Sequence, residues 1–141
     1  MTQKVYYMDS CIWLNLFKKE GDSIKGVPYW QLAKSFLEKD NEMIVSTIIL
    51  KELSYKLENK FDEVKQFFKK NSFIKIIKTT SKDYDLARTY EDEEEFKISF
   101  YDYLHVAIAK RLNIPLITRD KDLITFANKH IEVHKPEDLL G

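Results

Sequence analysis

The chain has 141 residues, of which 44% are hydrophobic and 33% are charged, and this is the composition of an ordinary globular protein. The length is sufficient to bury a core, and we expect one domain over residues 1–141. The 23 Lys and Arg residues balance the 23 Asp and Glu residues. A strongly basic nucleic-acid-binding domain is therefore excluded, although a local basic patch is not.

The sequence has no segment typical of a membrane or secreted protein. No window approaches the roughly 18 apolar residues that a membrane-spanning helix needs. The first ten residues, MTQKVYYMDS, contain no apolar run suited to a signal peptide. Cys11 is the only cysteine, so it cannot form an intramolecular disulfide, and we interpret it as a small buried hydrophobe. These features predict a cytoplasmic protein in a reducing compartment.

Predicted strands and helices alternate along the chain. In chain order, hydrophobic patterning predicts a strand at 5–8, a helix at 11–17, an irregular segment at 21–28, a helix at 29–39, a strand at 43–45, helices at 47–57 and 62–70, a strand at 73–77, helices at 82–96 and 99–112, a strand at 116–118, a helix at 122–128 and a strand at 131–133.

The character of the predicted strands indicates the fold class. They are short unbroken apolar runs, and such runs are typical of a parallel sheet that is covered by helices on both faces. The charge run EDEEE, at 91–95, is interpreted as a solvated helix end. We therefore expect an α/β fold with a mainly parallel central sheet.

Acidic side chains recur where this architecture places its ligand site, in the crevice beyond the carboxyl ends of the strands. Asp9 follows the first strand, and Asp120 and Asp122 follow the fourth. Glu52 lies near one turn into the helix after the second strand. Asp102 lies in the first turn of the helix that precedes the fourth strand.

Each of these carboxylates also has a structural interpretation. Asp9, Asp120 or Asp122 could cap a helix, and Ser99-x-x-Asp102 resembles a capping box. Glu52 could be a boundary residue beside an apolar helix stripe. Their coincidence at one edge of the sheet is harder to explain in this way, because like charges repel and burial increases the cost. A cation relieves that repulsion, and oxygen ligands suit Mg²⁺ or Mn²⁺.

The remaining chemical signals are weaker. His105 follows Asp102 by one turn, and we interpret it as a helix residue beside the core, with metal ligation as the alternative. His130 and His134 have no recognisable ligand spacing. No Gly-rich phosphate loop and no Ser-His-Asp arrangement is apparent. A carboxylate-bound divalent ion, which can activate water against a phosphodiester, is the chemistry that the residues favour.

Three segments together resemble the PIN-domain ribonuclease family, which includes the VapC-type toxins of toxin–antitoxin pairs. They are YYMDSCIWLNLF, VSTIILKELSYKL and FYDYLHVAIAKRLNIPLITRDKDL, and they span most of the chain. The four acidic positions of the family match Asp9, Glu52, Asp102 and Asp120. Asp122 matches a further acidic position that family members often use.

The resemblance implies a three-layer α/β/α fold and a Mg²⁺- or Mn²⁺-dependent endoribonuclease that hydrolyses RNA, acting as the toxin of a toxin–antitoxin pair. It also implies an antitoxin protein as a partner and a homodimer. The four matched carboxylates, with Asp122, would hold one or two cations and would be the catalytic residues.

Other residues near these positions have supporting roles in the hypothesis. Arg119, Lys121 and Lys18, which flank the carboxylates in sequence, are candidate phosphate contacts. The hydroxyls of Thr118 and Ser10 could bond to a carboxylate or to water.

Two other functions remain open from the sequence. One is a metal-dependent phosphohydrolase that acts on small phosphoesters. The other is a non-catalytic module of the same fold that binds a protein partner and needs no metal.

Overall fold

The structure is a computed structural model that describes residues 4–21 and 24–140. Residues 22–23 of the irregular segment predicted at 21–28 lie outside the described residues. The elements are β1 (Lys4–Met8), α1 (Ser10–Lys18), α2 (Tyr29–Leu37), β2 (Asn41–Ser46), α3 (Thr47–Leu57), η1 (Glu58–Lys60), α4 (Phe61–Lys70), β3 (Ile74–Ile77), α5 (Ser81–Glu93), α6 (Phe100–Leu112), β4 (Leu116–Ile117), α7 (Lys121–Ala127), β5 (Val133–His134) and η2 (Pro136–Leu139).

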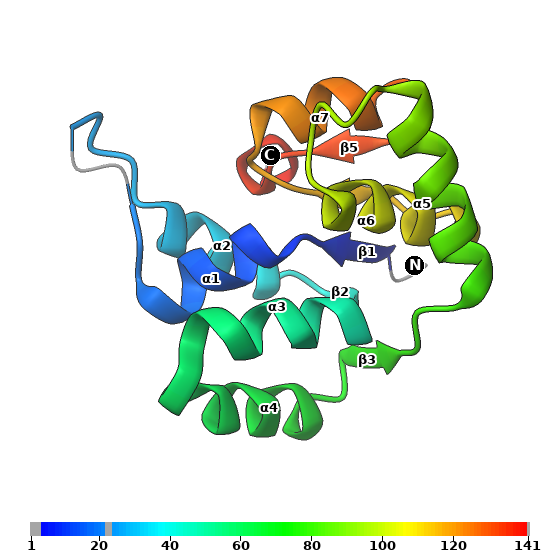
Figure 1. The fold of residues 1–141 in the computed structure, drawn as a ribbon. Coiled ribbons are helices and arrows are strands. Elements are labelled where there is room, and N and C mark those ends of the chain that lie inside the picture. The colour runs from blue at the N-terminus through cyan, green and yellow to red at the C-terminus, as the bar shows by residue number, and fades with distance from the viewer. Residues whose placement is uncertain (1–3, 22–23, 141) are drawn as a thin grey trace.

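The strands form a five-stranded sheet in the order β3-β2-β1-β4-β5, and all of its pairings are parallel. Figure 1 shows this sheet between helices. β1 is the central strand, with β2 on one side and β4 on the other. The predicted parallel sheet is confirmed. Because every strand runs in the same direction, all the carboxyl ends lie at one edge.

Two neighbouring tyrosines of β1 show that helices cover both faces of the sheet. Successive side chains of a strand point to opposite faces. The ring of Tyr6 packs edge-on against Phe36 of α2, with 5.1 Å between ring centroids. The hydroxyl of Tyr7 instead contacts His105 of α6. α2 and α6 therefore lie on opposite sides, and the predicted three-layer α/β/α arrangement is confirmed.

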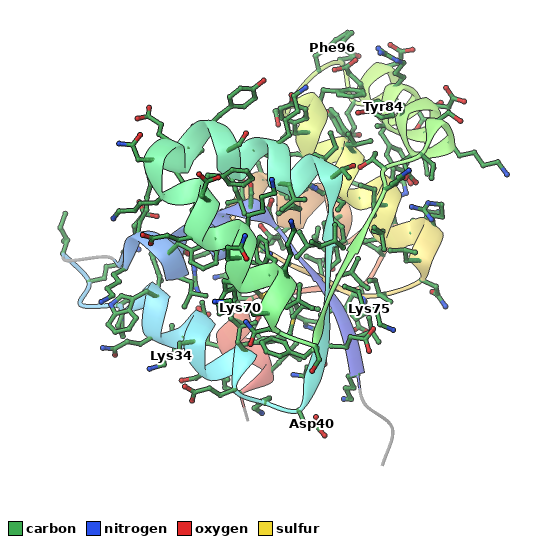
Figure 2. All side chains as sticks on the ribbon, turned by 90° about the horizontal axis from the view of Figure 1, so that it is seen from below. Lys34, Asp40, Lys70, Lys75, Tyr84 and Phe96 are labelled. Carbon is green, nitrogen blue, oxygen red and sulfur yellow. The ribbon has the colours of Figure 1, made fainter. Side chains whose placement is uncertain are left out.

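One predicted boundary differs clearly from the structure, at the end of α5. The helix ends at Glu93 rather than at residue 96, and Glu95 and Phe96 adopt positive φ angles of 55° and 60°. The acidic run is the physical reason, since negative side chains at a helix C-terminus oppose the helix dipole. Phe96 lies in the exposed loop beyond the helix (Figure 2).

No helix among the described residues is long and apolar enough to cross a membrane.

An ion pair fixes α5 against α6, the helix that carries Asp102. The carboxylate of Asp83 is buried, and it accepts bonds from Arg111 Nε at 2.7 Å and Nη2 at 3.1 Å. It also accepts the backbone N–H of Thr80 at 2.9 Å, which completes a capping box at the start of α5. The Asp83 side chain thus stabilises the start of α5 and also binds α6 through Arg111.

Replacing this anchor should destabilise the fold. We expect Asp83→Ala to lower the free energy of unfolding by about 2 kcal/mol, because it removes the partner of the Arg111 guanidinium and one of the two bonds of the capping box. Urea denaturation followed by circular dichroism measures the change. Asp85→Ala, at an exposed position of the same helix, is the matched control, with an expected change below about 0.5 kcal/mol. Equal effects of the two substitutions would contradict the assignment.

Candidate metal centre

Asp9 lies at the carboxyl edge of the sheet, directly after the central strand. Its backbone N–H bonds to Ile117 O of β4 at 2.9 Å, which holds the two strand ends together. Asp9 occupies the N-cap position of α1, yet its side chain makes no capping bond. Its Oδ2 instead accepts the hydroxyl of Thr118 at 2.9 Å, and its Oδ1 accepts that of Ser10 at 3.4 Å. The carboxylate is buried and is not used to cap the helix.

A second carboxylate and an imidazole face Asp9. Glu52 of α3 places Oε1 2.6 Å from Nε2 of His105, and the same nitrogen lies 3.6 Å from Oδ1 of Asp9. One ligand atom from each of these three side chains lies within 4.8 Å of the others. This is the only such group of at least three acidic, histidine or cysteine side chains among residues 4–21 and 24–140.

The protonation of His105 reflects these neighbours. Complete burial acts to lower the pKa of the imidazole, but the hydrogen bond to Glu52 and the negative charges of Asp9, Glu52 and Asp102 outweigh it. The pKa of His105 is therefore raised above its ordinary value. His105 is buried, as its interpretation as a residue beside the core predicts. The same side chain also belongs to the group that contains Asp9 and Glu52.

Two further polar residues stand behind the imidazole. Nδ1 of His105 lies 2.7 Å from the hydroxyl of Tyr7, which in turn lies 2.7 Å from Oγ of Ser46. Burial raises the pKa of Tyr7 well above its ordinary value, the bond to Ser46 lowers it, and the charge of Asp9 raises it further. Sequence reasoning placed Ser46 at the end of the second strand but assigned no role at the site to either residue. The one available signal is that Tyr7 precedes Asp9 by two positions and so points to the same side of β1.

Asp102 is a third carboxylate, and it is close enough to Asp9 for the two charges to interact. It stands in the first turn of α6, where Ser99 Oγ accepts its backbone N–H at 3.3 Å. Burial and the charge of Asp9 raise the pKa of Asp102 to about 6, with a smaller contribution from Asp120, while His105 and Ser99 oppose the shift. Burial and the nearby charge of Asp9 together disfavour the ionised form of this carboxyl, and a bound cation would lower that cost.

The two acidic residues after β4 are placed differently. Oδ1 of Asp120 caps α7 by accepting the backbone N–H groups of Asp122 at 2.9 Å and Leu123 at 3.2 Å. The capping role considered from the sequence is therefore realised for Asp120, which keeps its second oxygen. The side chain of Asp122 is exposed. Neither residue belongs to the group that contains Asp9, Glu52 and His105.

The cationic candidates for substrate contact fall into two kinds. Lys18 ends α1 and Lys121 begins α7, and both are exposed. The guanidinium of Arg119 is largely buried. Its Nη1 bonds to Glu137 at 2.7 Å, and its Cζ lies 4.1 Å from the ring centroid of Tyr29. Arg119 must leave these partners before it can reach a phosphate.

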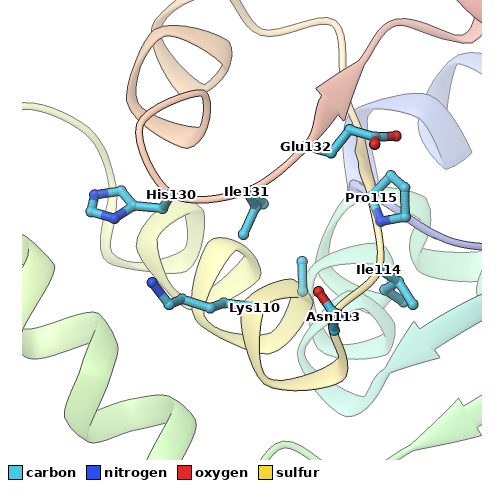
Figure 3. A pocket seen from close by; sticks show the side chains of 8 residues that line it. Lys110, Asn113, Ile114, Pro115, His130, Ile131 and Glu132 are labelled. Atoms are coloured by element: carbon cyan, nitrogen blue, oxygen red, sulfur yellow. The ribbon is translucent and has the colours of Figure 1, made fainter.

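The pocket in Figure 3 lies away from the carboxylates. It has a volume of about 350 Å³ and is lined by Ala109, Lys110, Asn113, Ile114, Pro115, His130, Ile131 and Glu132. The segments at 113–115 and 131–132 precede β4 and β5, so this pocket is at the amino edge of the sheet. It contains none of the residues predicted for the site.

The residues at the carboxyl edge fit a divalent cation. Carboxylate oxygens from Asp9 and Glu52 are hard ligands of the kind that Mg²⁺ and Mn²⁺ prefer. The donors come from separate elements that the fold holds in place.

Comparison with known families identifies the chain. The model of the PIN domain matches residues 6–129. The chain therefore belongs to the PIN-domain family, a family of nucleases, as the three sequence segments predict. Comparison with curated proteins found no match.

Solved structures support the same fold. A chain of VapBC2 from Rickettsia felis, bound to a DNA fragment from its promoter, is 22% identical over 93% of this chain and 98% of its own, with a TM-score of 0.67. A chain of FitAcB from Neisseria gonorrhoeae is 16% identical over 95% and 99%, with a TM-score of 0.64. A chain of DNA-bound VapBC from Salmonella typhimurium is 16% identical over 96% and 99%, with a TM-score of 0.65.

The raised pKa of Asp102 predicts a specific effect on stability. The folded protein protonates this carboxyl near pH 6 and the unfolded chain near pH 3.8, so wild-type stability falls as pH rises between these values. In EDTA at pH 8 we expect Asp102→Asn to be more stable than wild type by about 2 kcal/mol. Below pH 3.8 this difference should disappear.

Thermal and urea denaturation across this pH range measure the difference. Asp85→Asn is the matched control and should follow the wild type at every pH. An Asp102→Asn variant that is less stable than wild type at pH 8 would show that burial and the charge of Asp9 do not destabilise the ionised carboxylate.

Proposed function

We propose that this protein is a divalent-metal-dependent endoribonuclease that hydrolyses phosphodiester bonds of RNA. The observation that carries the proposal is the convergence of Asp9 and Glu52 on one buried imidazole at the carboxyl edge of a PIN-domain sheet. The raised pKa of Asp102 beside Asp9 supports it, because a repulsive group of carboxylates is suited to cation binding.

The proposed roles follow from where each side chain stands. Asp9 and Glu52 bind Mg²⁺ or Mn²⁺, with Asp102 and the free oxygen of Asp120 on the same edge and Asp122 further out. When bound, the cation supplies a Lewis acid that lowers the pKa of water and neutralises charge on the phosphodiester. Thr118 keeps the Asp9 carboxylate in one orientation through its 2.9 Å hydrogen bond.

Phosphate contacts to the rest of the RNA complete the proposal. Lys121 is exposed at the start of α7, directly after Asp120, and Lys18 is exposed at the far end of α1, the helix that follows Asp9. Such contacts position a substrate and carry little sequence information. Arg119 joins them only if it exchanges Glu137 for a phosphate.

We further propose that the protein acts in the cytoplasm as the toxin of a toxin–antitoxin pair, with an antitoxin protein as its partner and a homodimer as its assembly. Support comes from the solved structures of similar fold, whose descriptions name VapBC and FitAcB assemblies.

The central test is cleavage of labelled single-stranded and structured RNA with Mg²⁺, with Mn²⁺ and with EDTA. We expect wild type to cut RNA only with metal. Asp9→Asn should lose at least about 100-fold in rate, because one ligand charge is removed while the shape is kept. Asp40→Asn is the matched control, since Asp40 is exposed in the turn before β2, at the amino edge of the sheet (Figure 2).

The same assay separates the two other functions. If p-nitrophenyl phosphate is hydrolysed and RNA is not, the protein is a phosphohydrolase of small phosphoesters. If metal has no effect and Asp9→Asn matches wild type on both substrates, the protein is a non-catalytic binding module.

A further inference from the structure

A chain of hydrogen bonds connects the candidate metal centre to the interior of the sheet. It begins at Oε1 of Glu52, passes through both nitrogens of His105 and the hydroxyl of Tyr7, and ends at Oγ of Ser46, with successive distances of 2.6, 2.7 and 2.7 Å. Ser46 also accepts the backbone N–H of Ile49 at 3.3 Å and so caps α3. We infer that His105 is a positioning residue, held by Tyr7, that fixes the Glu52 carboxylate next to Asp9 for cation binding.

The short contact between His105 and Glu52 determines what the imidazole can do. With Glu52 ionised, as a cation ligand must be, Nε2 at 2.6 Å from its oxygen must carry a proton, because two acceptors at this distance would repel. A nitrogen that carries a proton cannot be a metal ligand. His105 therefore donates to Glu52, and the second oxygen of Glu52 is left for a cation.

The hydroxyls behind the ring fit this arrangement. In the neutral Nε2–H tautomer, Nδ1 accepts the Tyr7 hydroxyl proton. In the imidazolium, Nδ1 donates to Tyr7, and Tyr7 donates to Ser46. Both forms keep a donor on Nε2, so the contact with Glu52 is the same in each. The Tyr7 hydroxyl can either donate to Nδ1 or accept from it, so Tyr7 holds the ring in place, and the contact with Glu52 selects the forms with a proton on Nε2.

The degree of burial shows that His105 does more than fill the core. Its side chain is completely buried, as is that of Tyr7. An apolar side chain of similar volume would fill the same space without the cost of burying polar atoms, and that cost is met here only because each polar atom has a partner. The bonds link β1, β2, α3 and α6, so they fix α3 relative to β1, the strand that Asp9 follows.

This inference rests on the metal site of the proposed function, and its test measures metal binding without RNA. Tyr7→Phe removes one hydroxyl and keeps the ring. We expect it to weaken Mn²⁺ binding about tenfold, as outer partners of metal ligands do when they are replaced. The EPR signal of unbound Mn²⁺ measures the dissociation constant. Tyr6→Phe is the matched control, because the adjacent tyrosine faces α2 on the other side of the sheet.

A pair of variants at His105 tests the donor directly. His105→Gln keeps an N–H donor near the position of Nε2, whereas His105→Leu has none. We expect Gln to retain most of the Mn²⁺ affinity and Leu to lose at least about tenfold. Circular dichroism confirms that each variant is folded, and Tyr7→Phe decides the question if His105→Leu is not.

Two results would overturn the inference. One is wild-type Mn²⁺ affinity in a folded Tyr7→Phe. The other is directly coordinated ¹⁴N in the electron spin-echo spectrum of bound Mn²⁺, which would make His105 a ligand. If instead Tyr7→Phe weakens Mn²⁺ binding while wild type cuts no RNA, the positioning role stands and the proposed function fails. If wild type cuts RNA and Tyr7→Phe binds Mn²⁺ with wild-type affinity, the proposed function stands and the positioning role fails.

Discussion

Repulsion between like charges is the constraint around which this structure is arranged. Asp9 and Glu52 approach one imidazole nitrogen to 3.6 and 2.6 Å, and Asp102 lies near enough for the charge of Asp9 to raise its pKa. Such an arrangement would spread apart in a flexible loop. It is held here by side-chain donors that leave the carboxylates little freedom: Thr118 for Asp9 and His105 for Glu52.

The parallel sheet supplies the rigidity that this crowding needs. β1 lies between β2 and β4, so the residues that follow each strand emerge at the same edge. Thr118 and Asp9 are separated by 109 positions in the chain and by 2.9 Å in space. Only the sheet brings them together. α3 begins at Thr47, directly after Ser46 at the end of β2, and this short connection keeps Glu52 near the same edge.

The sequence allows much of this to be predicted, because unbroken apolar runs and helical spacing are local properties. The predicted α3 coincides with the observed one, and Asp9 and Glu52 do meet at the carboxyl edge. Hydrogen bonds between side chains that are far apart in the sequence cannot be predicted in this way. The bonds of His105 to Tyr7 and of Arg119 to Glu137 depend on the depth and rotation of helices, which hydrophobic periodicity does not specify. η1 and η2 are also too short to leave a periodic pattern.

The two aspartates that follow β1 and β4 differ in whether their side chains bond to the backbone. Asp9 makes no capping bond, whereas Asp120 accepts two backbone N–H groups through one oxygen. Asparagine accepts such bonds equally well at an N-cap. An Asp-to-Asn change at position 120, which needs one nucleotide substitution, therefore removes a charge from the edge while the turn persists. If the proposed nuclease activity depends on this charge, a single genetic step would abolish the activity and leave the fold in place.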